Sequence, residues 1–98
     1  MDVKKQLNVA IESGEVQIGS NKSIESLLNG NPKLVLLSRN CPRKQREAIT
    51  YYCRLAGVPV VTLKENSVEV GSGVGKPYPI SAVTVLDEGE STILEAAQ

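Results

Sequence analysis

The spacing of apolar residues divides this chain into alternating helices and strands. Apolar residues recur three or four positions apart over 2–13, 21–29 and 42–56, which is the spacing of one buried helix face. Continuous apolar runs of strand length cover 33–38 and 82–86. Such runs are typical of parallel strands that are buried on both faces. The pattern therefore predicts three helices and two central strands.

Weaker patterns complete the set of elements. Further strands are predicted at 15–18 and 58–63, and a short final helix at 90–97. The segment 67–70 is ambiguous, because its alternation favours a strand whereas Asn66 is a good helix N-cap. Helices that alternate with strands predict an α/β layer fold, with helices on both faces of a central sheet.

Turn-forming residues bound these elements. Asp2 can cap the first helix, and Gly14, Gly30 and Gly57 stand where helices stop. Pro42 stands where a first helical turn tolerates proline. The side chains expected to face the core from the second and third helices are Ile24, Leu27, Leu28, Ile49, Tyr52, Cys53 and Ala56.

Composition is that of one globular domain spanning 1–98. The hydrophobic content of 41% argues against disorder. No apolar run approaches the ~18–20 residues of a membrane span. The first residues carry lysines with no apolar signal core behind them. These features predict a cytoplasmic protein with no membrane partner.

The chemistry of the side chains argues against an enzyme. Without histidine, neither a Ser-His-Asp nor a Cys-His site can be built. Cys41 and Cys53 fit no zinc or redox spacing; two free thiols are expected in a reducing cytosol, with a disulfide as the alternative. We expect no catalytic residue, no metal site and no cofactor.

A glycine-rich segment at 71–76 suggests a phosphate loop but does not match one. That motif needs glycine, four residues and then Gly-Lys-Ser/Thr, whereas Val70 takes the first glycine position and Pro77 replaces the hydroxyl residue. The dinucleotide motif also fails, because its third glycine comes one residue early. We expect no ATP binding here.

The net charge is formally zero, yet basic residues gather in one segment. A local basic patch on a neutral protein can bind phosphates, although a solvated helix face is the alternative. The basic residues of this segment are Arg39, Arg43, Lys44, Arg46 and Arg54, against the single acid Glu47.

Two polar turns are predicted to meet at one edge of the sheet. The turn at Gly19 follows the strand that ends at Ile18, and Asn40 follows the strand that ends at Ser38. Loops that leave the carboxyl ends of parallel strands share an edge, so the turns should be neighbours. This edge has the groups that bind RNA. Amides can read base edges, basic groups and the free N–H groups of a helix start can contact phosphates, and an aromatic such as Tyr78 can pack on a base. A polar edge without a ligand is the alternative.

The order of these segments resembles one family. Matching segments run through 18–24, 33–40, 47–57 with its Tyr51-Tyr52 pair, 67–71, 74–78 and 87–94. Together they are similar to the archaeal and eukaryotic large-subunit ribosomal protein thirty-e family. That family lies within the kink-turn RNA-binding superfamily that also holds ribosomal protein seven-a-e. The resemblance implies a three-layer α/β/α sandwich with a mixed sheet of about four strands, and a helix at 67–73.

The resemblance also implies a site for a kink-turn, an RNA bend built around tandem sheared G·A pairs. The helix start at 19–22 would enter the RNA groove, with Asn21 as the base reader. Tyr78 would pack on a flipped-out base, and the basic residues would contact phosphates. Pro77 and Pro79 would stiffen the loop of Tyr78. The residues expected to bind RNA are Gly19, Ser20, Asn21, Lys22, Asn40, Arg43, Lys44, Lys76, Tyr78 and Ile80.

The expected role is a structural constituent of the large ribosomal subunit. Its partners would be kink-turn ribosomal RNA and neighbouring large-subunit proteins, and the free protein would be a monomer. A kink-turn protein outside the ribosome, acting in RNA modification or mRNA regulation, is one alternative. An enzyme or nucleotide-binding domain that uses 71–76 is another.

Overall fold

The fold is built around one mixed sheet. The computed structural model describes residues 2–97, and within them four strands pair in the order β1-β4-β2-β3. β2 and β3 are parallel, whereas β4 runs antiparallel to both β1 and β2. The strands are β1 (Glu15–Ile18), β2 (Leu34–Leu37), β3 (Val60–Thr62) and β4 (Ala82–Asp87).

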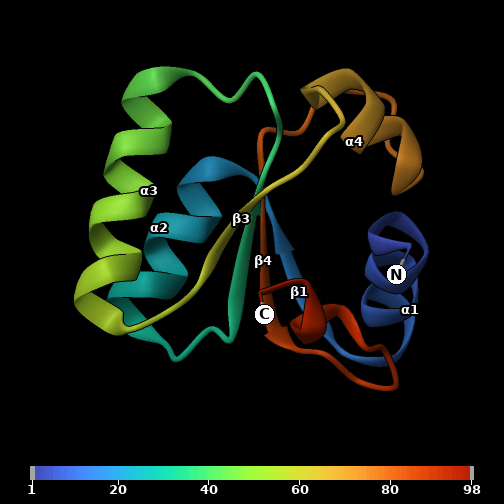
Figure 1. Cartoon of the computed structure of the whole chain (residues 1–98), viewed down its shortest axis with the longest axis horizontal. Coiled ribbons are helices and arrows are strands. Elements are labelled where there is room, and N and C mark those ends of the chain that lie inside the picture. The colour runs from blue at the N-terminus through green and yellow to red at the C-terminus, as the bar shows by residue number, and fades with distance from the viewer. Residues whose placement is uncertain (1, 98) are drawn as a thin grey trace.

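Helices cover both faces of the sheet, as Figure 1 shows with the sheet seen nearly edge-on. α2 and α3 pack on one face, and α1, α4 and a short 3-10 helix pack on the other. This arrangement confirms the α/β/α sandwich. The helices are α1 (Val3–Ser13), α2 (Ser20–Asn29), α3 (Arg43–Ala56), α4 (Ser67–Gly73) and the 3-10 helix η1 (Ile93–Ala97). None of them, within 2–97, is long and apolar enough to cross a membrane.

The core consists of two apolar layers that share β2. Leu34 and Leu36 face the side of α1 and α4, while Val35 and Leu37 face α2 and α3. All of β2 is buried, as the continuous apolar run predicts. The prediction that such strands form a parallel sheet is wrong for β4. Burial on both faces requires two helical layers but does not decide the direction of the neighbouring strand.

Strand pairing brings the two polar turns to the same edge. Ile18 at the end of β1 pairs with Val83, and Leu37 at the end of β2 pairs with Ala82. Both strands therefore end beside the start of β4, and the predicted meeting of the two turns is confirmed. The N–H of Gly19 donates to the Ala82 carbonyl at 2.9 Å, which closes the edge.

Three boundary and burial predictions are wrong. Leu28 is 60% exposed, because it lies about 100° around α2 from the buried Leu27. Ala56 is exposed, because it lies at the end of the last turn of α3. The final helix is a 3-10 helix confined to Ile93–Ala97, and its buried anchor is Ile93.

The ambiguous segment forms α4, as the family resemblance implies and against its local alternation. Asn66 and Glu69 form a capping box: the Asn66 side chain accepts from the Glu69 N–H at 2.9 Å, and Glu69 accepts from the Asn66 N–H at 3.0 Å. These two bonds satisfy donors at the helix start. Capping therefore decides this short helix, since its seven residues include two glycines.

Replacement of a core leucine tests the assignment of the buried face. We expect Leu36→Ala to lower the free energy of unfolding by about 2–5 kcal/mol, because it leaves a cavity between β2 and α1. Leu55→Ala is the control: Leu55 is 68% exposed, so its effect should stay within about 0.5 kcal/mol. Urea denaturation measures both, and equal losses would contradict the assignment.

Candidate nucleic-acid interface

An open recess of about 300 Å³ lies where β1 ends and β4 begins. One wall is the start of α2, and the other is the segment that leads into β4. We call it the edge recess. Its lining residues are Ile18, Gly19, Ser20, Asn21, Gln45, Tyr78, Pro79, Ile80 and Ser81.

The α2 wall presents free backbone donors. Gly19 is the N-cap residue and makes no side-chain cap, and the first helical bond runs from the Ser23 N–H to the Gly19 carbonyl. Among residues 2–97, no acceptor contacts the N–H groups of 20–22. α1 and α4, by contrast, are capped by the side chains of Asp2 and Asn66. An uncapped helix start of this kind favours an anion or a base edge.

The opposite wall carries Tyr78, whose side chain is 52% exposed. The Tyr78 carbonyl lies so close to Gly71 of α4 that a Cβ there would collide with it. The Ile80 N–H donates to the Ser67 carbonyl at 2.9 Å. These contacts hold the Tyr78 segment against α4, so its ring is presented from a fixed backbone. Gly71 acts through close packing and not through flexibility.

Two structural facts bear on the roles predicted for this segment. Ile80 is only 2% exposed and packs in the core, so it has almost no apolar surface to extend a contact to a base. Gly71 and Gly73 lie within α4, which leaves no loop of backbone amides to cradle a phosphate.

Gln45 lines the edge recess, although it is not among the residues predicted to bind RNA. Ser20 Oγ donates to Gln45 Oε1 at 2.8 Å, which joins the starts of α2 and α3. Gln45 is the third residue of α3, where a glutamine often reaches back to the N–H of the N-cap residue. Here the N-cap residue is Pro42, which has no N–H, so the Gln45 amide is free to reach Ser20. A glutamine three residues after a helix-initiating proline was the available signal.

Asn40 has a structural role that the sequence did not indicate. Its Oδ1 accepts from the Ser67 N–H at 2.7 Å and ties the β2–α3 connection to the start of α4. Arg46 is fixed in a similar way: its guanidinium donates to Thr62 Oγ1 at 3.0 Å and to the carbonyls of Ser38 at 3.0 Å and Arg39 at 3.3 Å. Both side chains brace the loops around the edge recess, and neither lines it.

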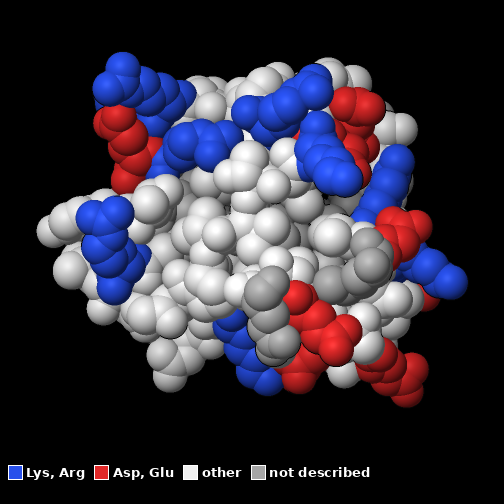
Figure 2. Space-filling view, viewed as in Figure 1, with Lys and Arg blue, Asp and Glu red and all other residues white. Residues whose placement is uncertain are grey.

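The remaining basic candidates lie outside the edge recess. Lys22 lines a separate groove with Gln17 and Glu25. Arg43 pairs with Glu47 at 2.7 Å on the exposed face of α3. Lys44 and Lys76 are also exposed, and neither lines the edge recess. Figure 2, viewed as Figure 1, shows an uncharged centre with cations along the upper margin and acids at the ends of that margin and below.

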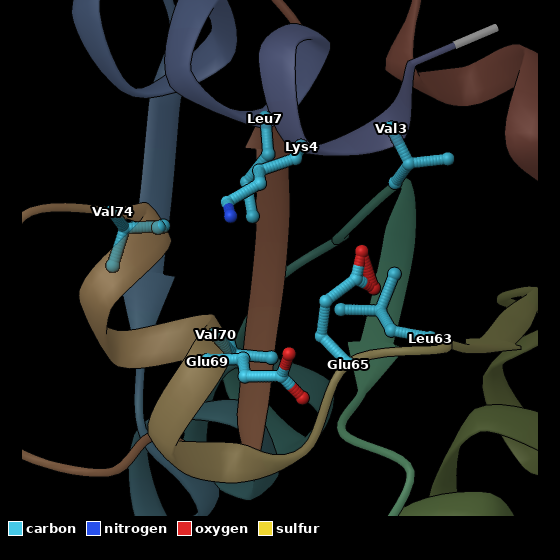
Figure 3. A pocket seen from close by; sticks show the side chains of 9 residues that line it. Val3, Lys4, Leu7, Leu63, Glu65, Glu69, Val70 and Val74 are labelled. Atoms are coloured by element: carbon cyan, nitrogen blue, oxygen red, sulfur yellow. The ribbon is translucent and has the colours of Figure 1, made fainter.

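A second recess, between α1 and α4, does not suit a nucleotide. Figure 3 shows Leu7, Val70 and Leu63 around it, with the carboxylates of Glu65 and Glu69 at its rim. Its volume is about 20 Å³, roughly the space of one water molecule. Lys4 also lines it, but this volume is too small for a nucleotide or a base, so we do not assign this recess to RNA.

The two cysteines are not activated as nucleophiles. Cys41 and Cys53 are free and buried, as expected for two thiols. Burial raises the pKa of Cys53 to about 11, and burial also raises the pKa of Cys41 against the opposing charge of Arg46. Both groups are therefore neutral thiols at pH 7. Within 2–97, no three acidic, cysteine or histidine side chains lie close enough together to hold a metal ion.

Comparison with known proteins finds similarity to ribosomal proteins of the large subunit. Residues 1–95 match the family described as "Ribosomal protein L7Ae/L30e/S12e/Gadd45 family". The chain is 44% identical to the large ribosomal subunit protein eL30 of Pyrobaculum calidifontis, over 100% of this chain and 97% of the relative. It is 43% identical to the eL30 protein of Methanothermobacter thermautotrophicus, over 97% of each chain.

A solved structure supports the fold alone. The structure of a protein with unknown function from Bacillus halodurans C superposes with a TM-score of 0.76 at 22% sequence identity. The match covers 97% of this chain and 92% of that one.

Gly71 provides a test of how the Tyr78 wall is held. We expect Gly71→Ala to lower the free energy of unfolding by about 1–3 kcal/mol and to shift the NMR signals of Tyr78, because the new methyl group collides with the Tyr78 carbonyl. Gly73→Ala is the matched control, since its Cβ would meet only the flexible end of Lys4. Tyr78 signals that stay unchanged in Gly71→Ala would contradict the packing argument.

Proposed function

This chain belongs to the ribosomal protein L7Ae/L30e/S12e/Gadd45 family, and on that premise we propose that it binds kink-turn ribosomal RNA as a structural constituent of the large ribosomal subunit. The observation that carries the proposal is the edge recess, in which an uncapped helix start faces a fixed, exposed tyrosine. The family supports a non-enzymatic role, and we assign the chain no catalytic residue, cofactor or metal.

The α2 wall suits the paired bases of a bent RNA. The free N–H groups of 20–22 can donate to base edges or phosphate oxygens that enter the groove. Asn21 is exposed beside them, and its amide can donate and accept at once. We therefore assign Asn21 the reading of the sheared G·A pairs, with Gly19 and Ser20 forming the backbone around it.

The Tyr78 wall suits an unpaired base. Bases splayed out of a bent RNA commonly stack on aromatic rings. The contacts of Tyr78 and Ile80 with α4 hold the Tyr78 segment before any ligand binds, which reduces the entropy lost on binding. Ile80 serves this wall as part of its buried support.

Basic side chains at the margins would contact the RNA backbone. Lys22, Lys44 and Lys76 are exposed, and Arg43 would have to share its charge with Glu47. The amide nitrogen of Asn40 is the group left to contact RNA in full, because its oxygen already accepts from Ser67. We assign these residues a positioning role, since phosphate contacts orient a complex without reading sequence.

The ribosomal assignment rests on the eL30 relatives, which match the chain over nearly its whole length. In this role the protein would act in the cytoplasm beside other large-subunit proteins, as a monomer before assembly. A kink-turn protein outside the ribosome is the alternative. RNA recovered with the tagged protein from its own cells separates them: ribosomal RNA supports the proposal, and guide RNA alone would replace it.

The central test compares a kink-turn RNA with a straight duplex of equal length. We expect Asn21→Ala to weaken kink-turn binding by at least about 1 kcal/mol, the scale of a lost base contact. Asn29→Ala, at the far end of the same helix, is the matched control and should bind as the wild type does. A gel-shift titration measures the affinity of the wild type and of both variants for each RNA. Equal wild-type affinity for both RNAs would refute kink-turn recognition, and an unaffected Asn21→Ala would remove Asn21 from the site.

The salt dependence of binding tests the balance between shape and charge. We expect the plot of log affinity against log salt concentration to have a slope no steeper than about −3, because each neutralised phosphate contributes roughly −0.7 to −0.9 and the lining of the recess includes no Lys or Arg. Titrations across a range of potassium chloride concentrations measure it. A slope of about −6 or steeper would mean that charge dominates binding.

A further inference from the structure

Two hydroxyl groups are buried between the sheet and α2. Ser23 and Thr84 are both 0% exposed. Thr84 Oγ1 donates to Ser23 Oγ at 2.6 Å, and Ser23 Oγ donates to the Gly19 carbonyl at 3.0 Å. The two hydroxyls therefore form a chain from the middle of β4 to the turn at the edge recess. We call it the hydroxyl relay.

The layer around the relay is apolar on the side of β2. Thr84 pairs with Val35 of β2 and with Gln17 of β1, and Ala82 is the neighbouring residue of β4 on the same face. Valine has the shape of threonine and could fill this site without a polar group. A buried hydroxyl gains little net stability even when it is paired, since it has left water. The relay instead restrains geometry, because a hydrogen bond requires a narrow range of distances and angles between the groups that it joins.

The relay ends on a residue that needs to be held. Gly19 has φ +110°, a backbone conformation that residues with a side chain rarely adopt. Glycine reaches many other conformations as easily, so the turn depends on hydrogen bonds to keep this one. Its N–H donates to the Ala82 carbonyl at 2.9 Å, and its carbonyl accepts from both the N–H and the hydroxyl of Ser23 at 3.0 Å. The Gly19 peptide is thus held at both ends by β4, directly through Ala82 and through the relay from Thr84.

The same strand determines where the opposite wall lies, because β4 begins directly after 78–81. We propose that Ser23 and Thr84 are positioning residues for RNA recognition. The hydroxyl relay sets the position of the α2 start, and hence of Asn21, relative to Tyr78. This inference rests on the proposed function. Neither hydroxyl touches RNA, and both act through the Gly19 peptide.

Variants at Thr84 separate positioning from stability. Thr84→Val keeps the shape and removes the hydroxyl. Ser23 Oγ then loses a donor and keeps its bond to the Gly19 carbonyl, so we expect a melting temperature below that of the wild type and kink-turn affinity about fivefold or more weaker. Thr84→Ser keeps the hydroxyl and loses a buried methyl group. We expect it to melt at a lower temperature and to bind within about twofold of the wild type. Thr50→Val, on the α3 face away from the recess, controls for the substitution type.

A loss of affinity in Thr84→Val that is absent in Thr84→Ser, although both variants melt at a lower temperature than the wild type, is the signature of positioning. If both variants lose affinity in proportion to their melting temperatures, or if Thr84→Val binds as the wild type does, the inference is wrong. Amide hydrogen exchange of the free protein gives a second readout. The Ser23 N–H should exchange faster in Thr84→Val than in Thr84→Ser, and equal exchange would also overturn the inference.

Failure of the proposed function would look different. A wild-type chain that binds kink-turn and straight RNA equally would refute kink-turn recognition, and with it any role of the relay in that recognition. The exchange experiment would still decide whether the two hydroxyls hold the Gly19 turn, because it needs no RNA.

Discussion

β4 pairs with β1 on one side and with β2 on the other, and this double pairing determines where the candidate interface lies. Because β4 is antiparallel to both neighbours, its first residues lie beside the last residues of each. The turn after Ile18, the loop after Leu37 and the segment before Ala82 therefore meet at one edge. The recess follows from strand direction, and no long loop is needed to build it.

The four α-helices differ in how their N-termini are capped, and the two without a side-chain cap lie at the edge recess. Asp2 and Asn66 cap α1 and α4, whereas the starts of α2 and α3 have no side-chain cap. A side-chain cap typically contributes about 1 kcal/mol. That contribution is forgone at the two helix starts that Ser20 and Gln45 join at the edge recess. Local deficits of this kind are expected at sites that take a ligand.

Much of the fold was predictable from the sequence, because periodicity and turn residues locate elements well. Periodicity locates a buried helix face but not its width: Leu28 was expected to face the core beside Leu27, yet it is exposed. The site was predictable where the backbone itself forms it, at Gly19 and its neighbours. It was not predictable where a side chain has two possible partners: Asn40 has an amide suited to RNA, yet its oxygen binds Ser67. Gln45 was missed because only the pairing of distant elements brings it to Ser20.

A neutral chain can bind a polyanion if its binding surface is rigid. The guanidinium of Arg46 donates to Thr62 and to the Ser38 carbonyl, and Arg43 is paired with Glu47. Few cations therefore remain free near the recess. Charge alone would attract straight and bent RNA alike, because both carry the same density of phosphates. On the proposal above, β4 holds the two walls at one separation, and such walls would admit one backbone geometry and exclude another. Weak charge combined with a rigid recess therefore favours recognition of RNA shape over general affinity for RNA.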